Sequence, residues 1–322
     1  MRRLAAHRAV RDAAAGELRQ VMALVSLLPM ISIDAAPAAF ASRPLFEPIA
    51  GLLARFGSRP LPGVDELNRL LDEVAPAATS GSDRTIRFVV PHEDDPAYEE
   101  RIFATGEVPT RPEDWHDFFN AMAWCVWPRT KATCNALHLA QIAARREAGL
   151  PGRGSCRDAL TQFDECGIVV VSASPEIPAL LAAHRWEEAF WERRGELQAT
   201  TRFLVFGHGT WDQLRQPFFG LCAKAIYRGV DADWLALSPD EQQVEADRWL
   251  AQHLTEQLED LSPRRLLPLP LLGVPGVTVD NAEREYYRDV RQFRPLREPS
   301  LKPRSSAPHD GSGRVRATRT RP

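Results

Sequence analysis

The residues best suited to chemistry are concentrated between Trp115 and Glu165. This stretch sets two histidines, two asparagines, an Arg-Thr-Lys triplet and several carboxylates among aromatic residues that we expect to be buried. Polar groups in apolar surroundings are costly unless they are paired. Such groups also supply general acids and bases, metal ligands and anion-binding groups. The stretch therefore nominates a functional site, although it contains no known catalytic signature.

Four polar residues are arranged symmetrically about Pro128. His116 and Asn120 are four residues apart, and Asn135 and His138 are three apart, so each pair shares one helix face. Pro128 is expected to end one helix or to kink it. If the two helices fold back antiparallel at this point, His116 faces His138 and Asn120 faces Asn135.

Two chemistries would follow from imidazoles that converge in this way. They could bind a divalent metal, with Asp117 or a later carboxylate completing the shell, or they could form a proton-transfer pair. His116 and His138 are then the candidate metal ligands, although no HExxH spacing supports a metal. In the alternative, each histidine makes one hydrogen bond in the core and Pro128 only kinks a single helix.

The triplet Arg129, Thr130 and Lys131 lies where the second helix would begin. A helix N-terminus favours anions, and two cations add charge-assisted hydrogen bonds, so the triplet is a candidate phosphate or carboxylate site. The alternative is that these cations form structural salt bridges with Asp164 or Glu165.

Asp164 and Glu165 are expected in the last turn of a helix, directly before a strand. Carboxylates are unfavourable at that end of the helix dipole, so a cation should lie beside them. The candidate partners are a metal or one of three side chains, Arg129, Lys131 and Arg157.

His208 occurs in FLVFGHGTWDQL, which predicts a strand, a Gly-His-Gly turn and a helix. Polar groups of functional sites often gather at strand ends. A histidine in a turn is also commonly a cap or a surface group, and this alternative stays open.

The pattern of apolar residues predicts a mainly helical α+β fold in which helices pack on a small sheet. Strands are expected at residues 85–90, 168–171, 201–206 and, more weakly, 222–230. Long helices are expected at residues 113–127, 131–147, 179–194 and 240–258, with a short one at 211–216. We divide the chain into an N-terminal extension (1–30), one compact domain (31–296) and a basic, disordered tail (297–322).

The net charge of −3 hides an uneven distribution. The tail carries seven Arg or Lys residues and two acidic residues, about +5, which leaves about −8 on the rest of the chain. The body therefore offers no basic field for specific nucleic-acid binding. Weak, salt-dependent binding through the RVRATRTRP segment is the alternative.

The five cysteines form no CxxC pair and no zinc-finger spacing, so neither a disulfide framework nor a structural zinc site is indicated. A reducing cytoplasm fits this pattern best. Export is the minority alternative, because an Arg-rich N-terminus precedes the apolar run VMALVSLLPMISI and a small-residue site at 39–41. That run of about 13 residues is too short to span a membrane.

Several motifs together resemble the bacterial family called domain of unknown function 3025 (DUF3025). They are GEVPTR, WHDFFNAMAW, PRTKATCNALH, RDALTQFDECG, FGHG, LPLPLLGVPG and FRP, in order between about residues 46 and 295. Cys166 and Gln213 depart from the Asn and the acidic residue expected there. The resemblance implies no activity, cofactor or catalytic residue.

These observations favour a hydrolase-type enzyme that acts on a small anionic ligand, with or without a divalent metal. The candidate catalytic residues are His116, Asp117, His138, Asp164, Glu165 and His208, and the candidate substrate-binding residues are Asn120, Arg129, Thr130, Lys131, Asn135 and Arg157. The alternative is a non-catalytic cytoplasmic binding or adaptor protein in which the same cluster is a satisfied buried network. A cleft beside the cluster would favour the enzyme.

We predict that deleting residues 297–322 leaves the melting temperature unchanged, because the segment has almost no apolar residue to bury. Only nonspecific retention on nucleic acid at low salt should fall. Thermal unfolding of the truncated and full chains checks this, and a truncated chain that unfolds would place the segment inside the domain.

Overall fold

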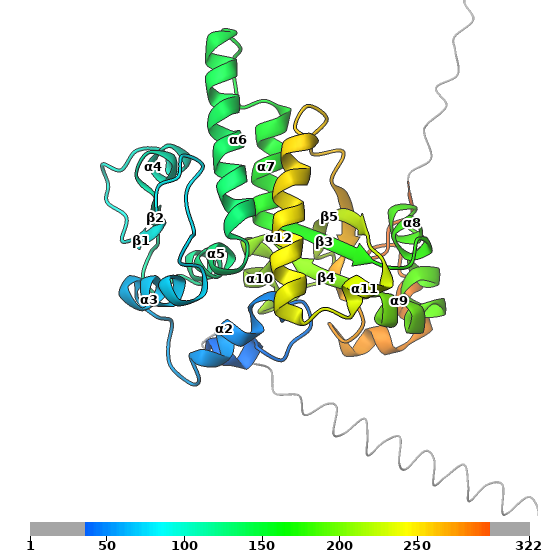
Figure 1. The fold of residues 1–322 in the computed structure, drawn as a ribbon. Coiled ribbons are helices and arrows are strands. Elements are labelled where there is room, and N and C mark those ends of the chain that lie inside the picture. The colour runs from blue at the N-terminus through cyan, green and yellow to red at the C-terminus, as the bar shows by residue number, and fades with distance from the viewer. Residues whose placement is uncertain (1–35, 297–322) are drawn as a thin grey trace, which may run out of the picture.

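Two small sheets and the helices around them make up residues 36–296, which are the residues that the computed structural model describes (Figure 1). The predicted extension 1–30 and tail 297–322 lie outside the described residues. A parallel pair joins β1 (Arg87–Val89) to β2 (Glu107–Pro109). The larger sheet has the order β4-β3-β5-β6, formed by Thr201–Val205, Gly167–Ser172, Cys222–Gly229 and Leu267–Pro270.

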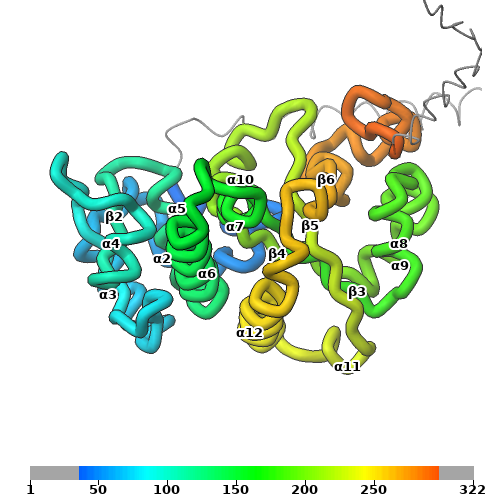
Figure 2. Tube along the Cα trace, turned by 90° about the horizontal axis from the view of Figure 1, so that it is seen from above, coloured from blue at the N-terminus to red at the C-terminus, as the bar shows by residue number. Residues whose placement is uncertain are grey.

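The helices precede, separate and cover these strands. They are α2 (Ala50–Arg55), α3 (Val64–Val74), α4 (Tyr98–Thr105), α5 (Trp115–Val126), α6 (Pro128–Glu147), α7 (Ser155–Cys166), α8 (Glu176–Ala182), α9 (Arg194–Thr200), α10 (His208–Leu214), α11 (Ala232–Leu235) and α12 (Pro239–Glu256). Viewed from above, α3 and α4 lie at one end of the molecule, α8 and α9 at the other, and α6, α7 and α10 between them (Figure 2). Within residues 36–296, no helix is both long enough and apolar enough to cross a bilayer.

Strand β3 is the centre of the larger sheet. It runs parallel to β5 on one side and antiparallel to β4 on the other, and all six of its residues are buried. Its sequence GIVVVS suits a strand covered on both faces. The α+β fold, mainly helical with small sheets, is therefore as predicted, and the four expected strands are confirmed.

The sequence failed to indicate strands β2 and β6 and one helix break. Strand β6 has the sequence LPLP and lies at the sheet edge, where proline is tolerated, so its composition suggested coil. The helix expected at 179–194 is instead α8 followed by a π-helical turn at Glu188–Glu192. His184 lies between them with a φ of 57°, a left-handed conformation that a helix cannot contain.

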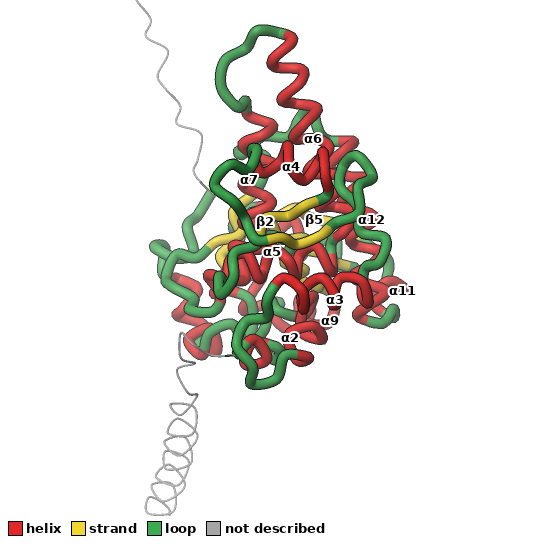
Figure 3. Tube along the Cα trace, turned by 90° about the vertical axis from the view of Figure 1, so that its left-hand side faces the viewer, coloured by secondary structure: helices red, strands yellow, loops and turns green. Residues whose placement is uncertain are grey.

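The predicted break at Pro128 is confirmed, but the fold-back is wrong. Trp127 alone separates α5 from α6, and its buried indole Nε1 donates to the Val205 carbonyl at 2.9 Å. A one-residue link is too short for an antiparallel hairpin of helices, which takes about 2–5 residues. Consequently α5 crosses the foot of α6 (Figure 1), and the far end of α6 projects from the body with the loop that follows it (Figure 3).

The start of α6 is capped by a carboxylate from α12. Asp247 is buried and accepts from the backbone N–H groups of Arg129 at 3.1 Å and Thr130 at 2.9 Å, and from the Thr130 hydroxyl at 2.8 Å. Burial raises the pKa of Asp247, and the hydrogen bonds from Thr130 and Arg129 oppose that shift. This cap joins α6 to α12 and so fixes the helix that carries Lys131.

We predict that Asp247→Ala lowers the free energy of unfolding by about 2–4 kcal/mol, because it removes a cap and leaves buried donors without acceptors. The control is Asp231→Ala, which removes an exposed cap from α11 and should cost about 1 kcal/mol. Chemical denaturation measures both losses. Equal losses in the two variants would show that the buried cap stabilises the fold no more than an exposed one.

Candidate functional site

The end of α7 and the start of α10 meet at one end of the larger sheet, where β3 begins and β4 ends. Asp164 and Glu165 lie in the last turn of α7, directly before β3, and His208 is the first residue of α10, just after β4. Because β3 and β4 are antiparallel, with Ile168 opposite Val205, the beginning of one strand lies beside the end of the other. The pairing therefore brings His208 to Asp164 and Glu165.

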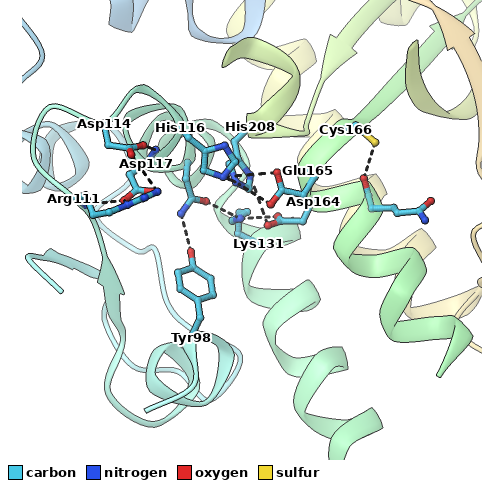
Figure 4. A network of polar contacts seen from close by, with 12 residues as sticks. Tyr98, Arg111, Asp114, His116, Asp117, Lys131, Asp164, Glu165, Cys166 and His208 are labelled. Carbon is cyan, nitrogen blue, oxygen red and sulfur yellow. Dashed lines mark hydrogen bonds and ion pairs between the residues drawn. The ribbon is translucent and has the colours of Figure 1, made fainter. Parts of the chain in front are cut away.

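A buried ion pair lies beneath this edge. The Lys131 ammonium is 2.6 Å from Asp164 Oδ1, and its side chain is only 4% exposed. Lys131 also donates to Asn120 Oδ1 at 2.9 Å, and Asn120 donates through Nδ2 to the Tyr98 hydroxyl at 2.7 Å. The chain of contacts joins α4, α5, α6 and α7 (Figure 4).

This ion pair keeps Asp164 ionised. Burial alone would raise the pKa of the carboxyl, but the Lys131 ammonium and the His208 ring outweigh it, and the pKa of Asp164 is lowered. On the other side, burial raises the pKa of the Tyr98 hydroxyl, and the nearby Asp164 and Glu99 charges raise it further. The hydroxyl thus stays protonated beside the ion pair.

Two imidazoles meet above the ion pair. His208 Nε2 and His116 Nε2 are 3.1 Å apart and within hydrogen-bonding distance, and His208 Nδ1 lies 3.7 Å from Asp164 Oδ2. His208 is 5% exposed, whereas the side chain of His116 is 36% exposed. Burial lowers the pKa of His208 to about 3, so its ring is neutral at physiological pH.

The Glu165 carboxylate completes the group. Its Oε2 is 3.7 Å from His116 Nε2, and its Oε1 is 3.7 Å from His208 Nε2. Burial, together with the Asp164 charge, raises the pKa of Glu165 against the opposing effect of His116. We call His116, Glu165 and His208 the central triad. Each member offers one ligand atom, and these atoms lie within 4.8 Å of one another.

The glycines beside His208 permit this close packing. A Cβ at Gly209 would lie 2.7 Å from Glu165 Oε2 and 3.0 Å from its backbone oxygen. A Cβ at Gly207 would lie 2.4 Å from the Gly167 backbone nitrogen and 2.6 Å from Cys166 Cα. The Gly-His-Gly motif thus allows α10 to approach the end of α7.

His138 and Asn135 are not part of the central triad, contrary to the predicted mirror arrangement. His138 is buried with Nε2 3.9 Å from Glu99 Oε1, and burial lowers its pKa. Asn135 donates to Glu99 Oε2 at 2.8 Å and accepts from the Gly81 N–H at 3.1 Å. His116 and His138 each lie eleven residues from Trp127, about 16 Å along their helices. Because α5 and α6 cross at Trp127 and do not fold back side by side, this distance carries the two histidines apart.

Asp117 is also directed elsewhere. The Arg111 guanidinium donates two hydrogen bonds to it, from Nε at 2.8 Å and from Nη2 at 2.9 Å, and the Arg111 backbone N–H donates a third at 2.7 Å. Figure 4 shows this pair beside His116 and apart from Glu165. The structure thus places Asp117 with Arg111 and not with the two imidazoles that meet.

In the predicted anion clamp, the helix N-terminus and the Lys131 ammonium are both occupied by the protein itself. The N–H groups of Arg129 and Thr130 bind Asp247, and the Lys131 ammonium binds Asp164. The salt-bridge alternative for Lys131 is confirmed, as is the expected cationic partner of Asp164. Arg157 interacts with other charges, including Glu99 and Asp158, and burial lowers its pKa.

Among residues 36–296, the groups nearest the Glu165 carboxylate are the rings of His116 and His208, each at 3.7 Å. The Lys131 ammonium acts on Glu165 electrostatically and makes no direct contact with it in the described residues. Sequence analysis also missed Tyr98 and Glu99. Both come from α4, which no spacing in the sequence connects to α6, so only the packing of α4 against α6 brings them here.

A small cavity adjoins the buried half of the cluster, between α4 and α6. It is lined by Tyr98, Glu99, Ile102, Trp124, Lys131, Cys134, Asn135, His138 and Asp164, and has about the size of one water molecule. The Nδ1 atom of His138 is buried beside it without a hydrogen-bond partner. This half of the cluster is closed to a substrate.

Comparison with known families gives one match. The model of the family described as protein of unknown function (DUF3025) matches residues 86–297, from the residue before β1 to the end of the described chain and one residue beyond. Every candidate site residue lies within this span. No curated protein and no solved structure matches the chain significantly.

We predict that Lys131→Met lowers the free energy of unfolding by about 3–5 kcal/mol at pH 7, because it leaves Asp164 buried without a counter-charge. The pKa of Asp164 is lowered by folding, so the contribution of the pair is complete above about pH 4 and is lost as the pH falls below it. The measured loss should therefore shrink in acid.

Arg55→Met is the matched control, because the Arg55–Glu73 pair is exposed on both sides and should contribute under about 1 kcal/mol. Denaturation at several pH values checks both variants. A loss for Lys131→Met as small as that of the control would contradict the account of the buried pair.

Proposed function

The chain belongs to the DUF3025 family, and we propose that it is a hydrolase whose reaction takes place at His116, Glu165 and His208. One observation carries the proposal. Three acid–base groups from three separate helices converge at a point that solvent reaches, with the two Nε2 atoms 3.1 Å apart and each 3.7 Å from the Glu165 carboxylate. Convergence of this kind is what general acid–base catalysis requires.

The roles follow from exposure and charge. Glu165 is 46% exposed and has a raised pKa, so it is suited to take a proton from an attacking water and to return it to the leaving group. His116 is partly exposed and orients the water or the substrate. His208 is buried and neutral, and it holds His116 in place through the contact between their Nε2 atoms.

The buried polar residues have a structural role in this proposal. Lys131 and Asn120 are consumed by contacts within the protein, and so is Asn135. An anionic substrate was expected because Arg129 and Lys131 seemed free to bind it in the sequence. Since the Lys131 ammonium is bound to Asp164, the proposal names a hydrolytic reaction and no particular charge on the substrate.

A binding protein is the second candidate, and a cavity of about 600 Å³ favours it. The cavity lies at the carboxyl ends of the parallel strands β3 and β5. The central triad lies at the opposite end of these strands. It is lined by Ser172, Ala173, Pro175, Arg228, Gly229, Val230, Asp231, Trp234 and Glu245. Ligands often bind at such strand ends.

We also propose a reducing compartment, the cytoplasm, as the place of action. All five cysteines are free in the structure, and two of them, Cys125 and Cys134, are buried where burial raises the pKa of the thiol. Free buried thiols are typical of proteins that stay reduced.

We predict that Glu165→Gln and His116→Ala each lower turnover of small ester, amide or phosphate-ester substrates by about 10²–10⁴-fold without lowering the melting temperature. Both side chains are partly exposed, so the fold does not depend on them. Glu93→Gln and His92→Ala change exposed residues of the same types and serve as controls. No turnover of any substrate class, or turnover that Glu165→Gln leaves intact, would contradict the hydrolase.

A further inference from the structure

We infer that His116, Glu165 and His208 bind one divalent transition-metal ion of the zinc type. The inference rests on the same triad as the proposed hydrolase and names its cofactor. With an ion bound, Glu165 and the two imidazoles would serve as its ligands, in place of the acid–base and orienting roles described for the metal-free triad. Metal binding can nevertheless be measured without a substrate, so the two proposals can fail separately.

The distances between the ligand atoms carry the inference. Zinc binds histidine nitrogen at about 2.0–2.1 Å and carboxylate oxygen at about 2.0–2.2 Å, so two ligands of a tetrahedral ion lie about 3.3–3.5 Å apart. The two Nε2 atoms are 3.1 Å apart, and the nearest Glu165 oxygen is 3.7 Å from each of them, Oε2 for His116 and Oε1 for His208. With a single carboxylate oxygen as ligand, the three ligand atoms lie within 4.8 Å of one another. A rotation of the carboxylate and small shifts of the two rings would therefore place all three ligand atoms around one ion.

The surroundings of His208 supply an independent observation. The ring is 5% exposed, and its Nδ1 atom is buried facing Asp164, with no well-formed side-chain hydrogen bond. That nitrogen lies 3.7 Å from Asp164 Oδ2, and Lys131 fixes the same carboxylate from behind at 2.6 Å. A histidine that binds metal through one nitrogen commonly directs the other at a carboxylate, which sets its tautomer and orientation.

The Glu165 side chain is positioned by the backbone of Gly209 as well as by the two imidazoles. It lies against Gly209, where a Cβ would come within 2.7 Å of Oε2. Glycine at this position leaves the carboxylate free to approach both imidazoles. The neighbouring Cys166 thiol contacts the Gln162 carbonyl at 3.0 Å and is directed away from the triad (Figure 4).

The type of ion follows from the donors. Two imidazoles and one carboxylate suit zinc, cobalt, manganese or iron, whereas calcium and magnesium prefer oxygen ligands alone. Three protein ligands leave a fourth position, and the exposure of His116 and Glu165 opens that position to solvent. A bound ion of this kind would make a water molecule acidic enough to attack at neutral pH.

The test uses the untagged full chain after treatment with a chelator. Cobalt(II) absorbance and zinc calorimetry should show one ion bound per chain. Asp164→Asn removes the carboxylate that faces His208 and should weaken metal binding by roughly 10–100-fold. His116→Ala and Glu165→Gln remove a ligand itself and should weaken metal binding by more than that. His92→Ala and Glu93→Gln change exposed residues of the same types and should bind as the natural chain does.

Gly209→Ala gives a variant that alters no ligand. Its Cβ should displace the Glu165 carboxylate and weaken metal binding at least 10-fold in a folded protein. Gly195→Ala is its control, because a Cβ there meets nothing within 4 Å, and it should leave binding unchanged.

Two results would overturn the inference: a natural chain that binds no ion, or binding that His116→Ala and Glu165→Gln both leave intact. Metal binding without hydrolysis would sustain the inference and refute the hydrolase. Hydrolysis by a natural chain that binds no added ion would sustain the hydrolase and refute the inference.

Discussion

The buried ion pair between Lys131 and Asp164 is the interaction on which the rest of the site depends. Removing either partner from such a pair leaves an uncompensated charge in the core, which is strongly unfavourable. The pair fixes α6 against α7, and Asn120 extends it to α5, the helix that carries His116. The same Asp164 carboxylate faces the ring of His208. One buried contact thus sets the relative positions of the elements that supply the central triad.

The sheet provides the second constraint. Antiparallel pairing of β3 with β4 places the end of α7 beside the start of α10, and the glycines on either side of His208 remove the side chains that would keep them apart. The result separates the cluster into two parts. Lys131, Asn120 and Asn135 are enclosed and saturated with partners, whereas His116 and Glu165 reach solvent. The enclosed residues therefore have a structural role, and the two residues that reach solvent are available for chemistry.

The sequence predicted the features that depend on local spacing. Strands β1, β3, β4 and β5, the break at Pro128 and a cation beside Asp164 all follow from alternation, proline geometry and the helix dipole. The pairing of His116 with His208 spans 92 residues and depends on which strands are neighbours, which no local pattern reveals. His138 was assigned instead because we expected a fold-back that a one-residue link does not allow. The sequence did mark His208, as a polar residue directly after a strand.

The most direct test of the central claim is anomalous diffraction from crystals of the protein grown with zinc. The account predicts one peak between His116 Nε2, His208 Nε2 and the Glu165 carboxylate, at about 2.0–2.2 Å from each ligand atom. It also predicts that the His208 Nδ1 atom faces Asp164. A triad free of zinc in such crystals, or His116 and His208 found apart, would contradict it.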